Sequence, residues 1–200
     1  MWHAHEREDM SQSDKDLLAL LASDLDRYFQ QLVLNYQHRL YVFALRQTGS
    51  SQDAEDIVQE AFLRTYYALG DYPPERLLVL KLQPWLYKIT LNLFYERKRR
   101  ERLQYVVLDT AEESVHLAIE DDAREQPEVL LEDRERLREL ESLVATLPGP
   151  YREAVNLFYF AELSYREIAD LLHQPLGTVK ANLHRGIRLL RKSLETQKSR

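Results

Sequence analysis

The chain has 200 residues, a formal net charge of −6 and an apolar fraction of 44%, so it can form one domain or two small ones. It contains no cysteine, which excludes disulfides and thiolate zinc sites, and its five glycines are few for an all-β fold. No apolar run is long enough to span a membrane and no signal-peptide pattern opens the chain, so we expect a cytoplasmic protein without membrane insertion.

Residues 1–16 are polar and charged, which predicts a disordered N-terminal tail. From Leu17 to Gln47, apolar residues recur at steps of three or four, which indicates a helix with a break near Ser23. These apolar residues are Leu18, Leu21, Leu25, Phe29, Leu32, Val33, Tyr36, Leu40, Phe43 and Ala44. The sequence Thr48-Gly49-Ser50-Ser51 predicts a turn after this helix.

A second helix is predicted from Asp53, because acidic residues suit the positive end of the helix dipole. Its core face comprises Ala54, Ile57, Val58, Ala61, Phe62 and Thr65. Its opposite face carries a contiguous polar patch of Glu55, Asp56, Gln59 and Glu60. Most patches of this kind are solvated helix faces, so the patch alone does not identify a partner.

A loop stiffened by prolines at residues 70–74 precedes a helix that is predicted from about Leu82 to Arg102. Aromatic and basic residues are interleaved along this helix, and they include Trp85, Tyr87, Lys88, Asn92, Phe94, Tyr95 and the basic run 97–100. Such a pattern suits single-stranded nucleic acid, because unpaired bases stack on rings while cations follow the backbone. The alternative is that the aromatic residues belong to the core and the cations complement the helix C-terminus.

Residues 104–129 interrupt the helical pattern. The stretch from Tyr105 to Glu128 holds eight Asp or Glu and one Arg without sustained periodicity, which predicts an acidic flexible linker. Helical periodicity resumes at Val129. The sequence therefore predicts an all-α protein with two small helical domains, residues 17–103 and residues 130–200.

The stretch from Leu147 to Leu194 has the pattern of a helix-turn-helix. Residues 151–160 predict a helix that packs on this motif. Ser164 and Glu167 form a capping box at the start of a short helix. Pro175 then interrupts the helix, and proline is well tolerated at the first position of the helix that follows. The apolar face of that longer helix comprises Val179, Leu183, Ile187, Leu190 and Leu194.

The other face of this helix is basic. It carries Lys180, His184, Arg185 and Arg188, with Thr178 and Asn182 on its flanks. Two amphipathic helices joined by a turn also occur in ordinary bundles, whose basic faces are only solvated. The segment from Lys180 to Arg200, however, holds seven Lys or Arg and one acidic residue in an acidic chain. Such a basic island favours phosphate binding, and the geometry suits a recognition helix in the major groove of DNA.

Several motifs in order resemble bacterial extracytoplasmic-function (ECF) sigma factors. They are DAEDIVQEAF at residues 53–62, PWLYKI at 84–89 with Asn92, LP at 147–148, LSYREIA at 163–169, GTVK at 177–180 and LHR at 183–185. The resemblance covers about Leu17 to Leu194. It implies a sigma factor that keeps the second and fourth conserved regions, binds core RNA polymerase and directs promoter recognition, −10 melting and transcription initiation.

The resemblance also implies roles for individual residues. The patch Glu55, Asp56, Gln59 and Glu60 matches the contact with the clamp of the polymerase β′ subunit. The residues assigned to −10 DNA are Tyr72, Trp85, Lys88, Asn92, Arg97 and Lys98, with Tyr72 in the loop that takes a flipped base. The residues assigned to −35 DNA are Thr178, Lys180, Asn182, His184, Arg185 and Arg188. The implied partners are promoter DNA, the polymerase β′ clamp and β flap, and an anti-sigma factor.

The chain departs from the pattern of this family at several positions. Many relatives have Ser-Arg where this chain has Ala181-Asn182, and Ala-Arg where it has Gly186-Ile187. The loss of one bidentate guanidinium changes which base edges can be read.

The resemblance leaves two alternative functions. One is a sigma-like decoy that binds an anti-sigma factor and never touches DNA, and the other is a stand-alone helix-turn-helix regulator. We expect no enzyme activity, cofactor or metal site, because no catalytic or ligand constellation gathers on these helices.

Overall fold

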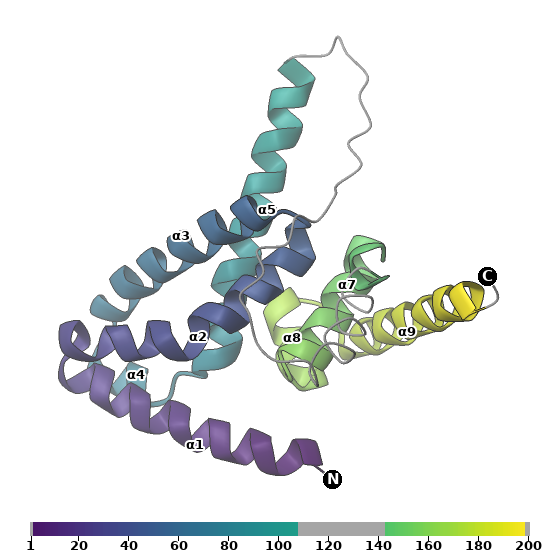
Figure 1. The fold of residues 1–200 in the computed structure, drawn as a ribbon. Coiled ribbons are helices and arrows are strands. Elements are labelled where there is room, and N and C mark those ends of the chain that lie inside the picture. Colours follow the sequence, from purple (N-terminus) through teal and green to yellow (C-terminus); the bar gives the residue numbers. More distant parts are fainter. Residues whose placement is uncertain (1, 108–142, 199–200) are drawn as a thin grey trace, which may run out of the picture. The chain divides into compact units, whose positions relative to one another are not determined.

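The computed structural model describes residues 2–107 and 143–198, and every regular element in these residues is a helix (Figure 1). The chain divides into two compact units: Met1–Ala44 with Asp53–Ala111, and Leu45–Gln52 with Glu112–Arg200. The prediction of an all-α fold with two helical parts is therefore confirmed. The predicted linker lies outside the described residues from 108 onward, whereas residues 104–107 are helical.

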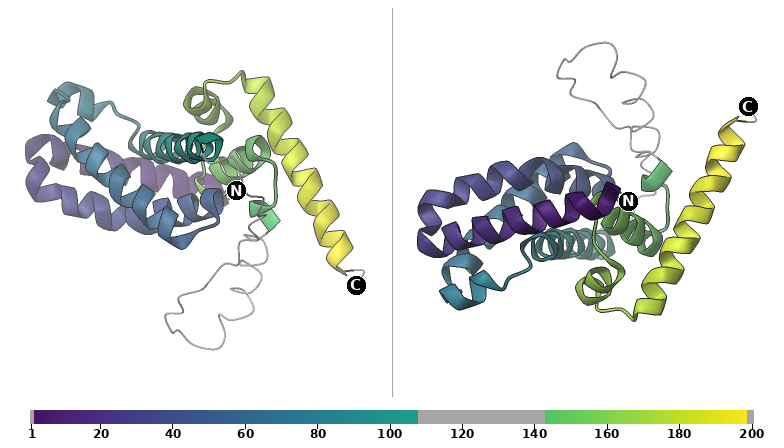
Figure 2. Two further views of the ribbon diagram at one scale, coloured as in Figure 1. Left: turned by 90° about the horizontal axis from the view of Figure 1, so that it is seen from above. Right: turned by 90° about the horizontal axis from the view of Figure 1, so that it is seen from below.

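The first unit begins with two helices, α1 (Trp2–Ser23) and α2 (Leu25–Thr48), which run side by side in Figures 1 and 2. Only Asp24 separates them, so the predicted break near Ser23 is confirmed. A carboxylate oxygen of Asp24 accepts a hydrogen bond of 3.1 Å from the backbone N–H of Arg27. Asp24 therefore satisfies an otherwise unpaired N–H group in the first turn of α2.

The prediction of a disordered tail over residues 1–16 was wrong, because α1 begins at Trp2. A contact distant in sequence ties this segment to α2: the hydroxyl of Tyr36 donates a hydrogen bond of 2.6 Å to the carboxylate of Asp14. Burial raises the pKa of the Asp14 carboxyl, although the Tyr36 hydrogen bond and the charge of Arg39 act in the opposite direction. Polar composition alone does not reveal such a partner.

Three helices complete the first unit: α3 (Ser51–Gly70), α4 (Pro74–Leu78) and α5 (Leu82–Val107). The predicted turn before α3 is present, and Gly49 adopts a φ of 74° that few other residues tolerate. All six residues predicted for the core of α3 are buried. The short helix α4 was not predicted; it lies against α1, and its Leu77 is 4% exposed. Helix α5 also contacts α1 and extends beyond the other helices of its unit (Figure 1).

The second unit contains α7 (Gly149–Val155), a π-helical segment η2 (Asn156–Phe160), α8 (Tyr165–Leu172) and α9 (Leu176–Lys198). The helix predicted over 151–160 thus changes to a wider turn at Asn156, whose carbonyl accepts a 3.0 Å hydrogen bond from Ala161. The capping box of Ser164 and Glu167 is confirmed.

The turn between α8 and α9 differs slightly from the prediction. Helix α8 ends where His173 adopts a left-handed conformation with a φ of 51°. Pro175 precedes the first residue of α9 rather than occupying that position, and its carbonyl accepts hydrogen bonds from Thr178 and Val179. The proline therefore helps to begin α9, while the backbone at His173 ends α8.

Close packing between α7 and α9 depends on Gly186. A methyl group at this buried position would lie 2.8 Å from Cγ2 of Val155 and 3.4 Å from Cβ of Tyr151. Val179 and Leu183, on the same side of α9, are 1% and 2% exposed. These contacts fix the rotation of α9 on its unit.

We predict that Gly186→Ala destabilises the protein. Overpacking costs about 1–3 kcal/mol and the higher helix propensity of alanine offsets about 1 kcal/mol, so the expected net loss is about 1 kcal/mol in the free energy of unfolding. Gly177→Ala on the same helix is the matched control, because nothing lies within 4 Å of its added methyl group. Thermal unfolding followed by circular dichroism should show a lower Tm for the first variant only. Equal Tm values for the two variants would contradict the packing argument.

Candidate nucleic-acid interface

One side of α5 carries aromatic, polar and basic residues. Positions seven apart on a helix differ by only about 20° of rotation, so Trp85, Asn92 and Arg99 share one side. Lys88 lies one turn from Trp85 and from Asn92. Asn92 and Arg99 are exposed, Trp85 and Lys88 are partly exposed, and Leu86 on the inner side is buried. We call Trp85, Lys88, Asn92 and Arg99 the outward face of α5.

The structure brings two predicted −10 residues from different elements together. The ring of Tyr72, in the loop before α4, lies 6.0 Å from that of Trp85, with an angle of 52° between the planes. Arg76 of α4, which the sequence analysis missed, places its guanidinium carbon 3.7 Å from the centre of the Tyr72 ring. Tyr72 lies outside α4, which begins at Pro74, so helical spacing gives no signal for this contact.

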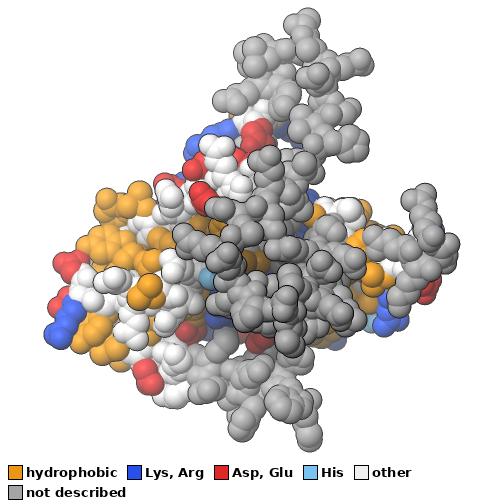
Figure 3. Space-filling view, viewed as in Figure 1, with side chains coloured by type: hydrophobic (Ala, Val, Ile, Leu, Met, Phe, Trp, Pro, Cys, Tyr) orange, Lys and Arg blue, Asp and Glu red, His pale blue; other side chains and the backbone are white. Residues whose placement is uncertain are grey.

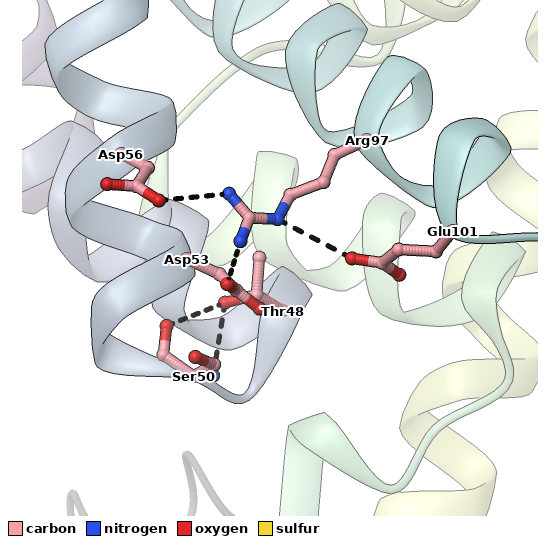
Figure 4. A network of polar contacts seen from close by, with 6 residues as sticks. All are labelled: Thr48, Ser50, Asp53, Asp56, Arg97 and Glu101. Atoms are coloured by element: carbon pink, nitrogen blue, oxygen red, sulfur yellow. Dashed lines mark hydrogen bonds and ion pairs between the residues drawn. The ribbon is translucent and has the colours of Figure 1, made fainter. Parts of the chain in front are cut away.

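Arg97 lies away from this face, although the sequence analysis assigned it to −10 DNA. Nine positions separate it from Lys88, which corresponds to about half a turn of rotation. Its guanidinium hydrogen-bonds to Asp53 and Asp56 of α3, at 3.2 Å to Asp56, and lies 3.5 Å from the carboxylate of Glu101 (Figure 4). Arg99, two positions further along α5, belongs to the outward face. Lys98, also predicted for DNA, is exposed.

A second group of ion pairs joins α3 to α5. Arg64 donates hydrogen bonds of 3.0 and 2.9 Å to the two carboxylate oxygens of Glu96, and one of 2.9 Å to Glu60. The Arg64 guanidinium lowers the pKa of Glu96, and the two carboxylates raise the pKa of Arg64. These groups line a groove of about 310 Å³ together with Asp56, Ile57, Leu93, Arg97 and Arg100.

The polar patch predicted to bind polymerase is present on α3, but its four members have different surroundings. Glu55 and Gln59 are exposed. Asp56 and Glu60 also face solvent in part, yet each is paired with an arginine, Asp56 with Arg97 and Glu60 with Arg64. Half of the patch therefore contributes to the stability of the unit as well as to its surface.

The predicted −35 residues lie along α9. Thr178, Lys180, His184, Arg185 and Arg188 are exposed and Asn182 is partly exposed. His184, Arg185 and Arg188 line a groove of about 370 Å³ together with Ile187 and Arg191. Arg191 was not among the predicted residues, although its spacing of three from Arg188 and seven from His184 places it on their side of the helix.

Lys180 lies nearer the start of α9 than the residues that line this groove. Its Nζ lies 5.7 Å from the centre of the Tyr165 ring on α8, and that ring stacks on Phe158 at 4.8 Å with an angle of 19°. The stack of rings therefore supports the lysine from the side of α8. Such support limits the rotamers of Lys180 while its ammonium stays exposed.

No group of three or more His, Asp or Glu side chains within residues 2–107 and 143–198 is arranged to hold a metal ion. No helix in these two ranges is both long and apolar enough to cross a bilayer.

Comparison with known proteins gives two family matches. Residues 32–104 match the model for Sigma-70 region 2, and residues 137–190 match the model for Sigma-70, region 4. The chain is 34% identical over 170 residues to the ECF RNA polymerase sigma factor SigW of Bacillus subtilis, which covers 83% of this chain and 88% of that protein. It is 31% identical to the RNA polymerase sigma-H factor of Pseudomonas aeruginosa, over 92% of this chain and 95% of that protein.

A solved structure has a similar fold. The sigma factor RpoE from Bartonella quintana, solved in complex with the anti-sigma factor NepR, superposes with a TM-score of 0.66 at 24% identity. The match covers 84% of this chain and 96% of that one.

The Arg64–Glu96 pair makes stability depend on pH. Because the folded-state pKa of Glu96 lies below its ordinary value of 4.5, the pair stabilises the fold above that pH and loses its contribution as pH falls through the folded-state pKa. The pair is partly exposed, so Glu96→Gln should cost less than about 1 kcal/mol at neutral pH. In urea titrations, this difference from the parent protein should vanish on acidification.

The matched control is Glu75→Gln, because Glu75 is exposed on α4. It should unfold like the parent protein at every pH. A difference between Glu96→Gln and the parent that stays constant from neutral to acidic pH would contradict the ion-pair explanation.

Proposed function

Because this chain belongs to the ECF family of RNA polymerase sigma factors, which direct promoter recognition and transcription initiation, we propose that its two units divide this work. The first unit binds core RNA polymerase and the −10 element, and the second binds the −35 element. The observation that carries the proposal is that the exposed residues of α3, α5 and α9 differ in charge and aromatic content. An acidic and polar surface lies on α3, an aromatic and basic one on α5, and a basic one on α9.

On α3, Glu55 and Gln59 belong to the proposed polymerase contact and, unlike Asp56 and Glu60, do not form the ion pairs that join α3 to α5. Their exposure leaves them available to a basic partner surface, for which the β′ clamp of polymerase is the candidate. Asp56 and Glu60 add negative charge beside them, although Arg97 and Arg64 partly neutralise it.

On α5, the outward face holds the melted −10 strand. The rings of Tyr72 and Trp85 offer stacking surfaces for unpaired bases, and Asn92 offers both a donor and an acceptor to a base edge. Lys88, Lys98 and Arg99 attract the phosphates. We assign the phosphate role to Arg99 in place of Arg97.

On α9, the exposed cations suit the major groove of the −35 element. Residues near the N-terminal end of a recognition helix reach base edges, while residues farther along contact the backbone. Lys180 therefore reads bases, and Arg188 and Arg191 hold phosphate. An anti-sigma factor is a further candidate partner, because the RpoE structure contains one. We propose that the protein acts in the cytoplasm, where core polymerase and promoter DNA are present.

The direct test is in vitro transcription with core polymerase on a library of random promoters. The proposal predicts transcripts only when the protein is added, from sequences with two separated conserved elements. A sigma-like decoy would give no transcripts, and a stand-alone regulator would bind DNA without needing polymerase.

A double charge change tests the polymerase contact. Glu55→Lys with Gln59→Lys should weaken binding to core polymerase by at least about tenfold, because two exposed groups become positive on a surface that meets a basic partner. Tm should stay unchanged, since neither residue pairs with α5 in the way that Asp56 and Glu60 do. Glu75→Lys provides the control at an exposed position on α4. Core binding by the double variant equal to that of the control would exclude this surface.

Two alanine variants separate base reading from phosphate contact on α9. Lys180→Ala should weaken the preferred −35 sequence by about 1–3 kcal/mol and reduce discrimination at one or two positions. Arg188→Ala should weaken all sequences about equally and lower the salt dependence by roughly one ion. Binding of a −35 duplex and its single-base variants at several salt concentrations distinguishes the two effects. Identical sequence profiles for the two variants would mean that α9 is oriented differently on DNA.

A further inference from the structure

Helix α4 holds Arg76 in a defined position. The helix begins at Pro74 after Pro73, and both rings restrict the backbone. Leu77 is buried on the side of α4 that faces α1, while Arg76, one residue earlier, is exposed. The backbone N–H of Arg76 donates a hydrogen bond of 2.9 Å to the carbonyl of Pro73. The anchored helix therefore presents the arginine toward the preceding loop.

The guanidinium of Arg76 covers one face of the Tyr72 ring. Its carbon lies 3.7 Å from the ring centre, which is the distance of a close cation–π contact. A base stacked on this face would place its atoms at about 3.5–4.0 Å, in the same space. The Trp85 ring lies 6.0 Å from the Tyr72 ring with an angle of 52° between the two planes, so these rings are not stacked in parallel. A base and the guanidinium therefore cannot occupy this face of Tyr72 together.

Arg76 also decides the net charge of the segment around Tyr72. Residues 71–81 contain two acidic groups, Asp71 and Glu75, and two basic ones, Arg76 and Lys81. Without Arg76 the segment would be net negative and would repel a phosphate backbone. The arginine thus places a positive charge directly against the ring to which the flipped base is assigned.

We propose that Arg76 is a DNA-binding residue that exchanges partners. In the free protein it covers Tyr72 and limits the motion of the ring. When an unpaired base of the melted strand stacks on Tyr72, the guanidinium leaves the ring and pairs with a phosphate of the same strand. This inference rests on the proposed function, because it requires that the first unit holds a melted strand at Tyr72.

The test uses the full chain bound to core polymerase and a forked DNA that carries the −10 element of a promoter selected from the random library. Affinity is measured at several salt concentrations, with the intact base or an abasic site at the flipped position. Tyr72→Leu should lose roughly 5- to 150-fold in affinity on intact DNA, with little further loss on abasic DNA. Arg76→Ala should lower the salt slope by about 0.7 ion on intact DNA, because it removes the phosphate contact. On abasic DNA it should leave the slope unchanged, because without a stacked base the guanidinium stays on the Tyr72 ring.

Two variants serve as controls for this measurement. Arg76→Lys keeps the charge and should keep the salt slope. Arg27→Ala removes a similar cation from the same unit, since Arg27 lies 5.4 Å from the Tyr28 ring on α2, and it should bind like the parent protein.

Three results would overturn the inference. If Arg76→Ala matches Arg27→Ala, the arginine does not bind DNA. If Arg76→Ala lowers the salt slope equally on intact and abasic DNA, the guanidinium binds phosphate whether or not a base stacks on Tyr72, and it does not exchange partners. If the parent holoenzyme fails to bind the forked DNA at all, the proposed function itself fails, and that outcome is distinguishable from the other two.

Discussion

The ion pairs of Arg97 are the contacts on which the arrangement of the first unit depends. Its guanidinium, which comes from α5, binds Asp53 and Asp56 of α3, and Arg64 with Glu96 joins the same two helices (Figure 4). Together with the buried residues of both helices, these pairs fix the rotation of α5 relative to α3. The acidic surface of α3 and the outward face of α5 therefore keep a constant relation, which a subunit that bridges polymerase and melted DNA requires.

In the second unit, packing rather than ion pairs fixes the rotation of the helix that carries the exposed residues. Gly186 allows α9 to approach α7 closely, and the buried Val179 and Leu183 hold the rotation of the helix. The basic residues of α9 consequently all point away from the core, and the stacked rings of Phe158 and Tyr165 support Lys180 from one side. The exposed arginines at the far end of the helix add charge without constraining the core. A surface that reads DNA needs fixed side-chain directions, because the direction of each side chain decides whether it contacts a base or a phosphate.

Features that depend on residues close in sequence could be predicted from the sequence. The capping box at Ser164, the core face of α3 and the break near Ser23 follow from spacings of one helical turn or less. The missed features depend on partners far apart in the chain. Asp14 is held by Tyr36, and Arg97 is held by residues 41 and 44 positions earlier, which periodicity cannot reveal. Arg76 was missed because the five-residue helix that places it is too short for a periodic pattern.

The most direct test of this account compares Arg97→Ala with Arg99→Ala in the same holoenzyme. Arg97 stabilises the pairing of α3 with α5, whereas Arg99 belongs to the outward face, so the two neighbours should behave differently. The salt dependence of binding to forked promoter DNA is measured for both, with Tm as the companion value. The account predicts that Arg99→Ala lowers the salt slope by roughly 0.7 to 0.9 ion at unchanged Tm, while Arg97→Ala lowers Tm and leaves the slope intact. A lower slope for Arg97→Ala together with a normal slope for Arg99→Ala would contradict it.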